Sequence, residues 1–238
     1  MNTDNLYLLQ WKQDNYPNEI LQKYAEINAI NTKQSLYGKL LVQMIVYRRF
    51  GINRESQKYL RGDYGKPYLS NLGDFYFNIS HSASVVAVAI SNQQIGIDIE
   101  QIDCADDAVA KHFFAADEQE FIAYASAHEK SKRFYQIWTA KEAYIKYCGT
   151  GLNKSLSSFS VLEEPLIHYI DSYMWNNRYI FSICQKTKHI FTCSVISTSW
   201  FEKQATNFLN NQINQLFIGH NCKDNKVLKA ANINKLSI

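Results

Sequence analysis

The sequence predicts an α+β protein built from two similar lobes. The first observation is that a helical pattern followed by a group of strand-like runs occurs twice along the chain, with a seam near residues 101–105. The second is that 238 residues, 46% of them hydrophobic, fit one or two domains with a substantial core. Such a composition excludes intrinsic disorder.

The first half of the chain supplies one helix and three strands. A helix is predicted over residues 35–50, because the apolar side chains of Leu36, Leu40 and Met44 recur on one helical face. Short runs of β-forming residues, separated by polar breaks, then predict strands over 75–79, 85–90 and 95–99. We expect these elements to form an N-terminal lobe over residues 1–102.

The second half repeats this order. Helices are predicted over 106–114, 117–127 and 131–147. Strands are predicted over 159–162, 166–170, 179–184 and 190–196. We expect a C-terminal lobe over residues 103–200, followed by an extension over 201–238. One amphipathic helix over 201–218 is expected to pack on the body, and the Asn- and Lys-rich remainder to be frayed.

Charge and cysteine content narrow the class of protein. The net charge of +3 is too small to indicate a nucleic-acid partner. No apolar run approaches the ~20 residues that span a bilayer, and the polar start has no signal-peptide pattern. Five scattered cysteines without a C-x-x-C pair indicate reduced thiols. We therefore expect a cytoplasmic protein without a membrane or nucleic-acid partner.

Two carboxylates are placed on one face of the strand predicted over 95–99. Side chains alternate along a strand, so Asp98 and Glu100 point to one face and the intervening isoleucine to the other. Two acids two residues apart suit a hard cation such as Mg²⁺. The same alternation is also ordinary for a strand whose polar face meets water.

A second group of candidate functional side chains lies on the helix predicted over 131–147. Trp138, Glu142 and Lys146 recur every four residues and therefore share a face. They could form the edge of a phosphate site or a surface ion pair beside a core tryptophan. A third cluster consists of a turn that presents Lys66 and, farther along, Ser80 and His81; these are either anion contacts or turn and capping residues.

In their order and spacing these clusters resemble the signature of 4′-phosphopantetheinyl transferases of the surfactin-synthetase type. The matching segments are Gly65–Pro67, Asn78–Ser82, Gly96–Glu100, Trp138–Lys146 and Gly149–Leu152. The resemblance covers about residues 36–160, a little over half of the chain. It implies a pseudo-dimer of two α/β lobes with coenzyme A bound in the cleft between them.

The resemblance also implies an activity. Such enzymes transfer the 4′-phosphopantetheine arm of coenzyme A to a serine hydroxyl of an apo acyl or peptidyl carrier protein, with Mg²⁺, or Mn²⁺ in its place, and release 3′,5′-ADP. The carriers serve fatty-acid, polyketide or peptide synthesis. We expect a monomer, since the internal duplication already supplies two lobes. The alternatives are a Mg²⁺-dependent phosphodiesterase and a non-catalytic coenzyme A-binding module, which would not need the three carboxylates.

The family's functional residues transfer onto matching positions of this chain. The metal ligands are implied to be Asp98, Glu100 and Glu142. Lys146 is implied to be the cationic side chain that contacts the pyrophosphate. The implied coenzyme A contacts are Lys39 at the 3′-phosphate, Tyr64, Gly65, Lys66 and Pro67 near the adenine, and Ser80 and His81 near the phosphates. Asp98, Glu142 and Lys146 are implied to contact coenzyme A as well.

The carrier serine must lose its proton, so a base is required. The segment 113–118 resembles a stretch in which an acid has that role, and Glu118 is the matching position. Asp117, Glu120 and a metal-bound water are the alternatives.

Overall fold

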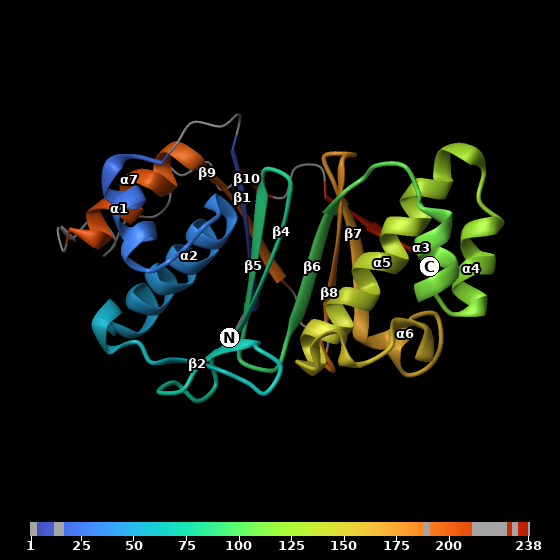
Figure 1. Ribbon diagram of the computed structural model, residues 1–238, viewed down its shortest axis with the longest axis horizontal. Coiled ribbons are helices and arrows are strands. Elements are labelled where there is room, and N and C mark those ends of the chain that lie inside the picture. Colours follow the sequence, from blue (N-terminus) through green and yellow to red (C-terminus); the bar gives the residue numbers. More distant parts are fainter. Residues whose placement is uncertain (1–3, 12–16, 188–190, 211–227, 230–232, 238) are drawn as a thin grey trace.

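The computed structural model describes residues 4–11, 17–187, 191–210, 228–229 and 233–237. Four layers follow one another across the molecule, with helices on both outer faces and two sheets between them (Figure 1). The α+β prediction is therefore confirmed. None of the helices among these residues is long and apolar enough to cross a bilayer.

The first sheet has the strand order β10-β9-β1-β5-β4. Its strands are β1 (Asp4–Gln10), β4 (Tyr76–Ser82), β5 (Val85–Ser91), β9 (Phe191–Ser197) and β10 (Leu228–Lys229). β1 and β9 are parallel, whereas β1 and β5, and β5 and β4, are antiparallel. The outer face of this sheet is covered by α1 (Glu19–Ile27), α2 (Lys33–Phe50) and α7 (Thr198–Leu209). A two-stranded ribbon, β2 (Tyr59–Arg61) and β3 (Pro67–Leu69), follows the short 3₁₀ turn η1 (Arg54–Ser56).

The second sheet has the order β11-β7-β8-β6 and is antiparallel throughout. Its strands are β6 (Gly96–Gln101), β7 (Ile170–Trp175), β8 (Tyr179–Cys184) and β11 (Ile233–Leu236). Its outer face carries the long helix α5 (Ala127–Cys148), around which pack α3 (Asp107–Phe113), α4 (Ala116–Ala123) and α6 (Leu166–Tyr169). The 3₁₀ turns η2 (Gly151–Asn153) and η3 (Leu156–Ser158) follow α5.

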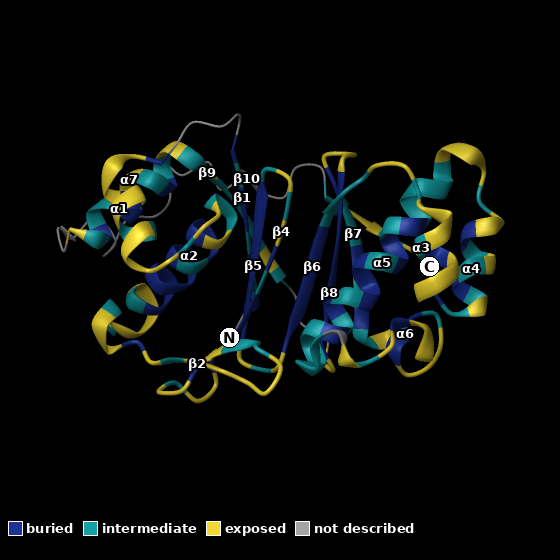
Figure 2. Cartoon of the chain, in the orientation of Figure 1, coloured by how far each residue is buried: buried dark blue, intermediate teal, exposed yellow. Residues whose placement is uncertain are grey.

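Strand β5 explains why its sequence is apolar without alternation. Val86, Val88 and Ile90 face the core under α2, whereas Val85 and Ala87 face the second sheet. Every residue of β5 is buried, and Figure 2 shows this strand in dark blue. Continuous apolar runs are typical of strands covered on both sides. Strand β6 alternates instead, with its isoleucines in the core between the sheets.

Two strand predictions in the second half are wrong. Residues 159–162 form no strand, because side chains take up their backbone groups: Glu118 accepts from the Val161 N–H and Lys141 donates to the Phe159 carbonyl. The segment predicted as a strand over 166–170 is helix α6 up to Tyr169, and the strand β7 begins at Ile170. Strand β1 and helix α1 were not predicted.

The division of the chain at residues 102 and 200 stays a prediction, but the sheets cross it. Strand β9, which belongs to the 103–200 segment, pairs with β1 in the first sheet. The helix predicted over 201–218 begins earlier, at Thr198, and ends at Leu209, and it packs on α1 and α2 as expected of a packed helix. Residues 211–218 of that prediction lie outside the described residues, as does most of the segment expected to be frayed; its described parts, β10 and β11, extend the two sheets.

We predict that Gly96→Ala destabilises the protein by about 3 kcal/mol or more, the upper range for overpacking a rigid site. A Cβ at Gly96 would lie 2.0 Å from the Ala143 carbonyl oxygen and 2.4 Å from the Tyr147 backbone nitrogen of α5. Both are backbone atoms and cannot rotate away. Urea unfolding measures the effect, with Gly73→Ala as the matched control, since a Cβ there meets no atom within 4 Å. Equal stability of the two variants would contradict the close docking of α5 on β6.

Candidate active site

The two sheets meet at the edges of β4 and β6, where side chains replace the usual backbone ladder. Three alternate residues of β4 each accept a hydrogen bond from a backbone N–H of β6. These bonds join Ile97 N to Asn78 Oδ1 at 2.8 Å, Ile99 N to Ser80 Oγ at 3.3 Å and Gln101 N to Ser82 Oγ at 3.0 Å. Since alternate residues of a strand share a face, one row of short polar side chains fixes the register between the lobes.

The same serines hold the two acids of β6. Ser80 Oγ donates to Asp98 Oδ1 at 2.7 Å, and Ser82 Oγ donates to Glu100 Oε2 at 2.6 Å. Ser80 is buried, and its hydroxyl is already engaged by protein groups. The structure therefore places Ser80 as a support of Asp98, and a direct contact of Ser80 with phosphate stays a prediction.

Helix α5 brings the second row of predicted residues to these acids. Lys146 Nζ donates to Asp98 Oδ1 at 2.5 Å and to Ser80 Oγ at 3.0 Å. Asp98 itself is only 3% exposed. Glu142 lies one turn earlier on α5, and its carboxylate interacts electrostatically with both Asp98 and Lys146. The structure thus places Glu100, Glu142 and Lys146 within electrostatic range of Asp98.

The electrostatics of this acidic cluster, Asp98, Glu100 and Glu142, show an excess of negative charge. Burial, together with the neighbouring carboxylates of Asp98 and Glu142, raises the pKa of Glu100 to about 6, against the hydrogen bond from Ser82 and the charge of Lys146. Burial also raises the pKa of Glu142, and Asp98 adds to the shift. Buried carboxylates that repel one another favour a bound cation.

The residues fit a divalent cation in one respect and differ in another. Asp98 Oδ2 is buried and has no hydrogen-bond partner among the residues that the structure describes, which leaves one anionic oxygen at the cluster available as a ligand. Among the described residues, however, no three His, Cys, Asp or Glu side chains converge closely enough to hold a metal. Lys146 takes the place of a cation on the other oxygen of Asp98. The oxygen donor set suits Mg²⁺, so the metal ligands stay a prediction.

Glu118 is not part of this cluster, which corrects its expected role as base. Its side chain is fully buried and pairs with the equally buried Lys141 at 2.7 Å. It also accepts from the backbone N–H groups of Ala115 and Val161 at 2.7 and 2.8 Å. A carboxylate held by three donors and shielded from solvent cannot reach a substrate hydroxyl. Lys141 also donates to the Leu156 and Phe159 carbonyls, so the pair fixes the segment beneath α5.

The turn that contains Gly65 has the geometry expected of a tight loop. Gly65 adopts φ +86°, the left-handed region that favours glycine, and its N–H donates to the Gly62 carbonyl. Tyr64, Lys66 and Pro67 line a cavity of about 550 Å³. The ammonium of Lys66 does not point to open space but donates to protein carbonyls, as described below.

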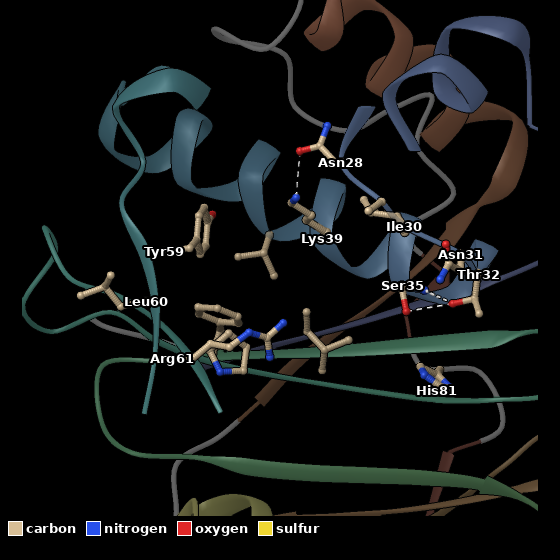
Figure 3. A pocket seen from close by; sticks show the side chains of 15 residues that line it. Asn28, Ile30, Asn31, Thr32, Ser35, Lys39, Tyr59, Leu60, Arg61 and His81 are labelled. Atoms are coloured by element: carbon tan, nitrogen blue, oxygen red, sulfur yellow. Dashed lines mark hydrogen bonds between the residues drawn. The ribbon is translucent and has the colours of Figure 1, made fainter. Parts of the chain in front are cut away.

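A second cavity, of about 850 Å³, lies between the N-terminal part of α2 and the β2–β3 ribbon (Figure 3). Lys39 and His81, both expected coenzyme A contacts, line it, and Pro67 is shared with the first cavity. Lys39 Nζ donates to Asn28 Oδ1 at 3.1 Å. Two basic groups beside a helix N-terminus make this cavity suitable for an anion.

Sequence reasoning missed most of the residues that line this cavity, among them Arg61 and Ser35. Arg61, the last residue of β2, lies on the side of the cavity opposite Lys39 (Figure 3). Ser35, in the first turn of α2, lines it too. The available signal for Arg61 was a basic residue immediately before the glycine turn at 62–65, whereas Ser35 carried no signal beyond its position near the helix start.

Comparisons with known proteins agree with this geometry. A sequence model of the 4′-phosphopantetheinyl transferase superfamily matches residues 94–193, and a model described as 4′-phosphopantetheinyl transferase, N-terminal, matches residues 13–94. The boundary between the two matches falls next to β6, at the seam between the sheets.

Two curated relatives are matched over more than two thirds of their own length, and a third over about half. 4′-phosphopantetheinyl transferase Sfp of Bacillus subtilis (strain 168) is 34% identical over 163 residues, which cover 63% of this chain and 73% of the relative. Another 4′-phosphopantetheinyl transferase of Bacillus subtilis is 30% identical over 182 residues, 71% of this chain and 80% of the relative. 4′-phosphopantetheinyl transferase HetI of Nostoc sp. is 32% identical over 123 residues, about half of each chain. The chain therefore belongs to the 4′-phosphopantetheinyl transferase superfamily.

Proposed function

We propose that this protein transfers the 4′-phosphopantetheine arm of coenzyme A to a serine hydroxyl of an apo acyl or peptidyl carrier protein and releases 3′,5′-ADP. The observation that carries the proposal is the contact of Lys146 with Asp98, beside Glu100 and Glu142, at the junction between the lobes. Cleavage of a pyrophosphate requires positive charge that stabilises the leaving phosphate, and a lysine beside acids that suit Mg²⁺ would supply it. Family membership supplies the reaction type.

The two neighbouring cavities suit the nucleotide part of coenzyme A. Arg61, Lys39 and His81 would face the 3′-phosphate and its neighbours, since charge-assisted hydrogen bonds to phosphate are stronger than neutral ones. The aromatic rim that includes Tyr64 would face the adenine ring. Pro67 lines both cavities, so one extended ligand would be able to occupy both.

Lys146 would stabilise the negative charge that develops on the leaving phosphate as its bond to the pantetheine phosphate breaks. Asp98 orients the ammonium, and Ser80 orients Asp98. Mg²⁺, when bound by Asp98, Glu100 and Glu142, would supply Lewis-acid stabilisation of the same pyrophosphate oxygens. Together these charges act in a partly buried site, where electrostatic interactions are strong.

The proton of the carrier serine requires an acceptor other than Glu118. Glu142 is half-buried on the face of α5 that meets the acidic cluster, and burial raises the pKa of its carboxylate. In this proposal the Glu142 carboxylate oxygen that is not bound to the cation would accept the proton of the serine hydroxyl. Asp117 accepts a hydrogen bond from Ser160, whereas Glu120 is exposed on α4. We therefore assign the base role to Glu142 in this proposal.

We further propose that the protein works as a monomer in the cytoplasm. The four cysteines that the structure describes are free thiols, which supports a reducing compartment. The carrier protein and coenzyme A are the proposed partners.

The first test is mass spectrometry of an apo carrier protein incubated with the enzyme, coenzyme A and Mg²⁺. We predict that the carrier gains the mass of one phosphopantetheine arm, and that a chelator prevents the gain until Mg²⁺ is restored. Glu142→Gln keeps the size of the side chain but removes the charge, so the rate should fall by about 10³-fold, the order attributed to a general base. Glu120→Gln, an exposed acid on α4, is the control. A Glu142→Gln enzyme with the wild-type rate would refute the assignment.

A second prediction concerns Glu118 and Lys141. Either Glu118→Gln or Lys141→Met leaves a buried charge without its partner, and should lower the free energy of unfolding by about 3–5 kcal/mol. The double variant Glu118→Gln/Lys141→Met removes both charges, keeps an acceptor for the backbone N–H groups of Ala115 and Val161, and should recover much of that loss. Urea unfolding of the four proteins measures the cycle. A Glu118→Gln protein with wild-type stability but no activity would restore Glu118 as the base.

A third prediction concerns Arg61. Arg61→Gln should weaken coenzyme A binding about tenfold, equivalent to ~1.4 kcal/mol, because a charged donor to the 3′-phosphate is lost. Binding of dephospho-coenzyme A, which lacks that phosphate, should not change. Isothermal titration calorimetry measures both ligands, with Arg54→Gln as the control; Arg54 pairs with Glu55 away from the cavity. Equal weakening for both ligands would place Arg61 elsewhere on the nucleotide.

A further inference from the structure

The side chain of Lys66 crosses from the β2–β3 ribbon to the second lobe. Its Nζ donates to the carbonyl oxygens of Ile95 at 2.9 Å, Lys146 at 2.5 Å and Tyr147 at 3.5 Å. Ile95 immediately precedes β6, and the other two carbonyls belong to the last turn of α5. An ammonium has three N–H donors. All three therefore have protein partners, and the group is not free to bind a nucleotide.

The carbonyls of Lys146 and Tyr147 are among those that a helix cannot satisfy by itself. The last four carbonyls of an α-helix have no intrahelical partner. In α5 the Gly149 N–H donates to Ile145 and the Gln94 side chain to Tyr147, while Lys66 covers Lys146 and contributes to Tyr147. A positive charge also complements the negative end of the helix dipole. Lys66 thus caps α5 from another part of the chain.

The environment of Lys66 makes this contact specific. Gly149 ends α5 with φ +70°, and a Cβ on that glycine would lie 3.5 Å from Lys66 Cδ, so the lysine stem runs close over the helix end. Burial lowers the pKa of Lys66 to about 8. The carbonyl oxygens accordingly take the place of the water that the ammonium has lost.

Lys146 lies on the same turn that Lys66 caps. The backbone carbonyl of Lys146 accepts from Lys66, while its side chain donates to Asp98. We infer that Lys66 is a positioning residue, which fixes the last turn of α5 so that the Lys146 ammonium stays at the acidic cluster. This inference rests on the proposed function, in which Lys146 acts on the pyrophosphate. It replaces the expected contact of the Lys66 side chain with coenzyme A.

The test is a double-mutant cycle with Lys66→Met and Lys146→Met, assayed for kcat, for the Kd of coenzyme A and for amide hydrogen exchange in the last turn of α5. Lys66→Met should lower kcat about tenfold or more, change the Kd less than twofold and accelerate exchange at 145–148. In the Lys146→Met background, Lys66→Met should have little further effect on kcat, because both act through one group. Lys58→Met, an exposed lysine before the same ribbon, is the control and should leave all three unchanged.

Two outcomes would overturn the inference. A weaker Kd for coenzyme A with unchanged exchange would make Lys66 a direct ligand. Additive losses of kcat in the double variant would separate Lys66 from Lys146. If Lys66→Met does not fold, Lys66→Gln is measured in the same way. Hydrogen exchange is recorded on the enzyme alone and does not depend on the reaction. If Lys66→Met exchanges faster but the wild-type enzyme transfers nothing to a carrier, the capping role is kept and the proposed reaction is rejected.

Discussion

The junction between β4 and β6 is the constraint on which the rest of this molecule depends. Two sheets from two lobes meet there through Asn78, Ser80 and Ser82, whose side chains accept from the backbone of β6. A backbone ladder would leave no side chain between the strands, whereas this row leaves serine hydroxyls that can also donate. Those hydroxyls orient Asp98 and Glu100. Ser80 and Ser82 therefore both join the lobes and support the acids.

The cost of this arrangement is the burial of like charges. The raised pKa values of Glu100 and Glu142 have burial as their main cause and the neighbouring carboxylates as a further one. Lys146 compensates only Asp98 by direct contact at 2.5 Å. Buried groups that are poorly compensated are common at functional sites, because the missing charge is supplied by a substrate or an ion. The charge balance of the cluster thus agrees with the proposed chemistry.

Helix α5 has to be placed accurately for this balance, and three contacts place it. The absence of a side chain at Gly96 lets the helix backbone approach β6 closely. The buried pair of Glu118 and Lys141 fixes the segment beneath the helix. Lys66 holds its C-terminal carbonyls. These contacts come from different parts of the sequence. A substitution at any one of them would therefore displace the Lys146 side chain, although none of these residues would contact the substrate.

The sequence by itself determined the two-lobed α+β class, the strands with strong β-forming runs and the acids on one face of β6, because periodicity is a local property. Only the tertiary structure decided the partners of charged groups. Glu118 and Lys66 resembled site residues in sequence, yet one is buried in an ion pair and the other caps a helix. Residues 159–162 have β-forming side chains, but their backbone groups form hydrogen bonds with the distant charged side chains of Glu118 and Lys141 instead of with a strand. Long-range contacts of this kind override local preference and leave no periodic signal along the chain.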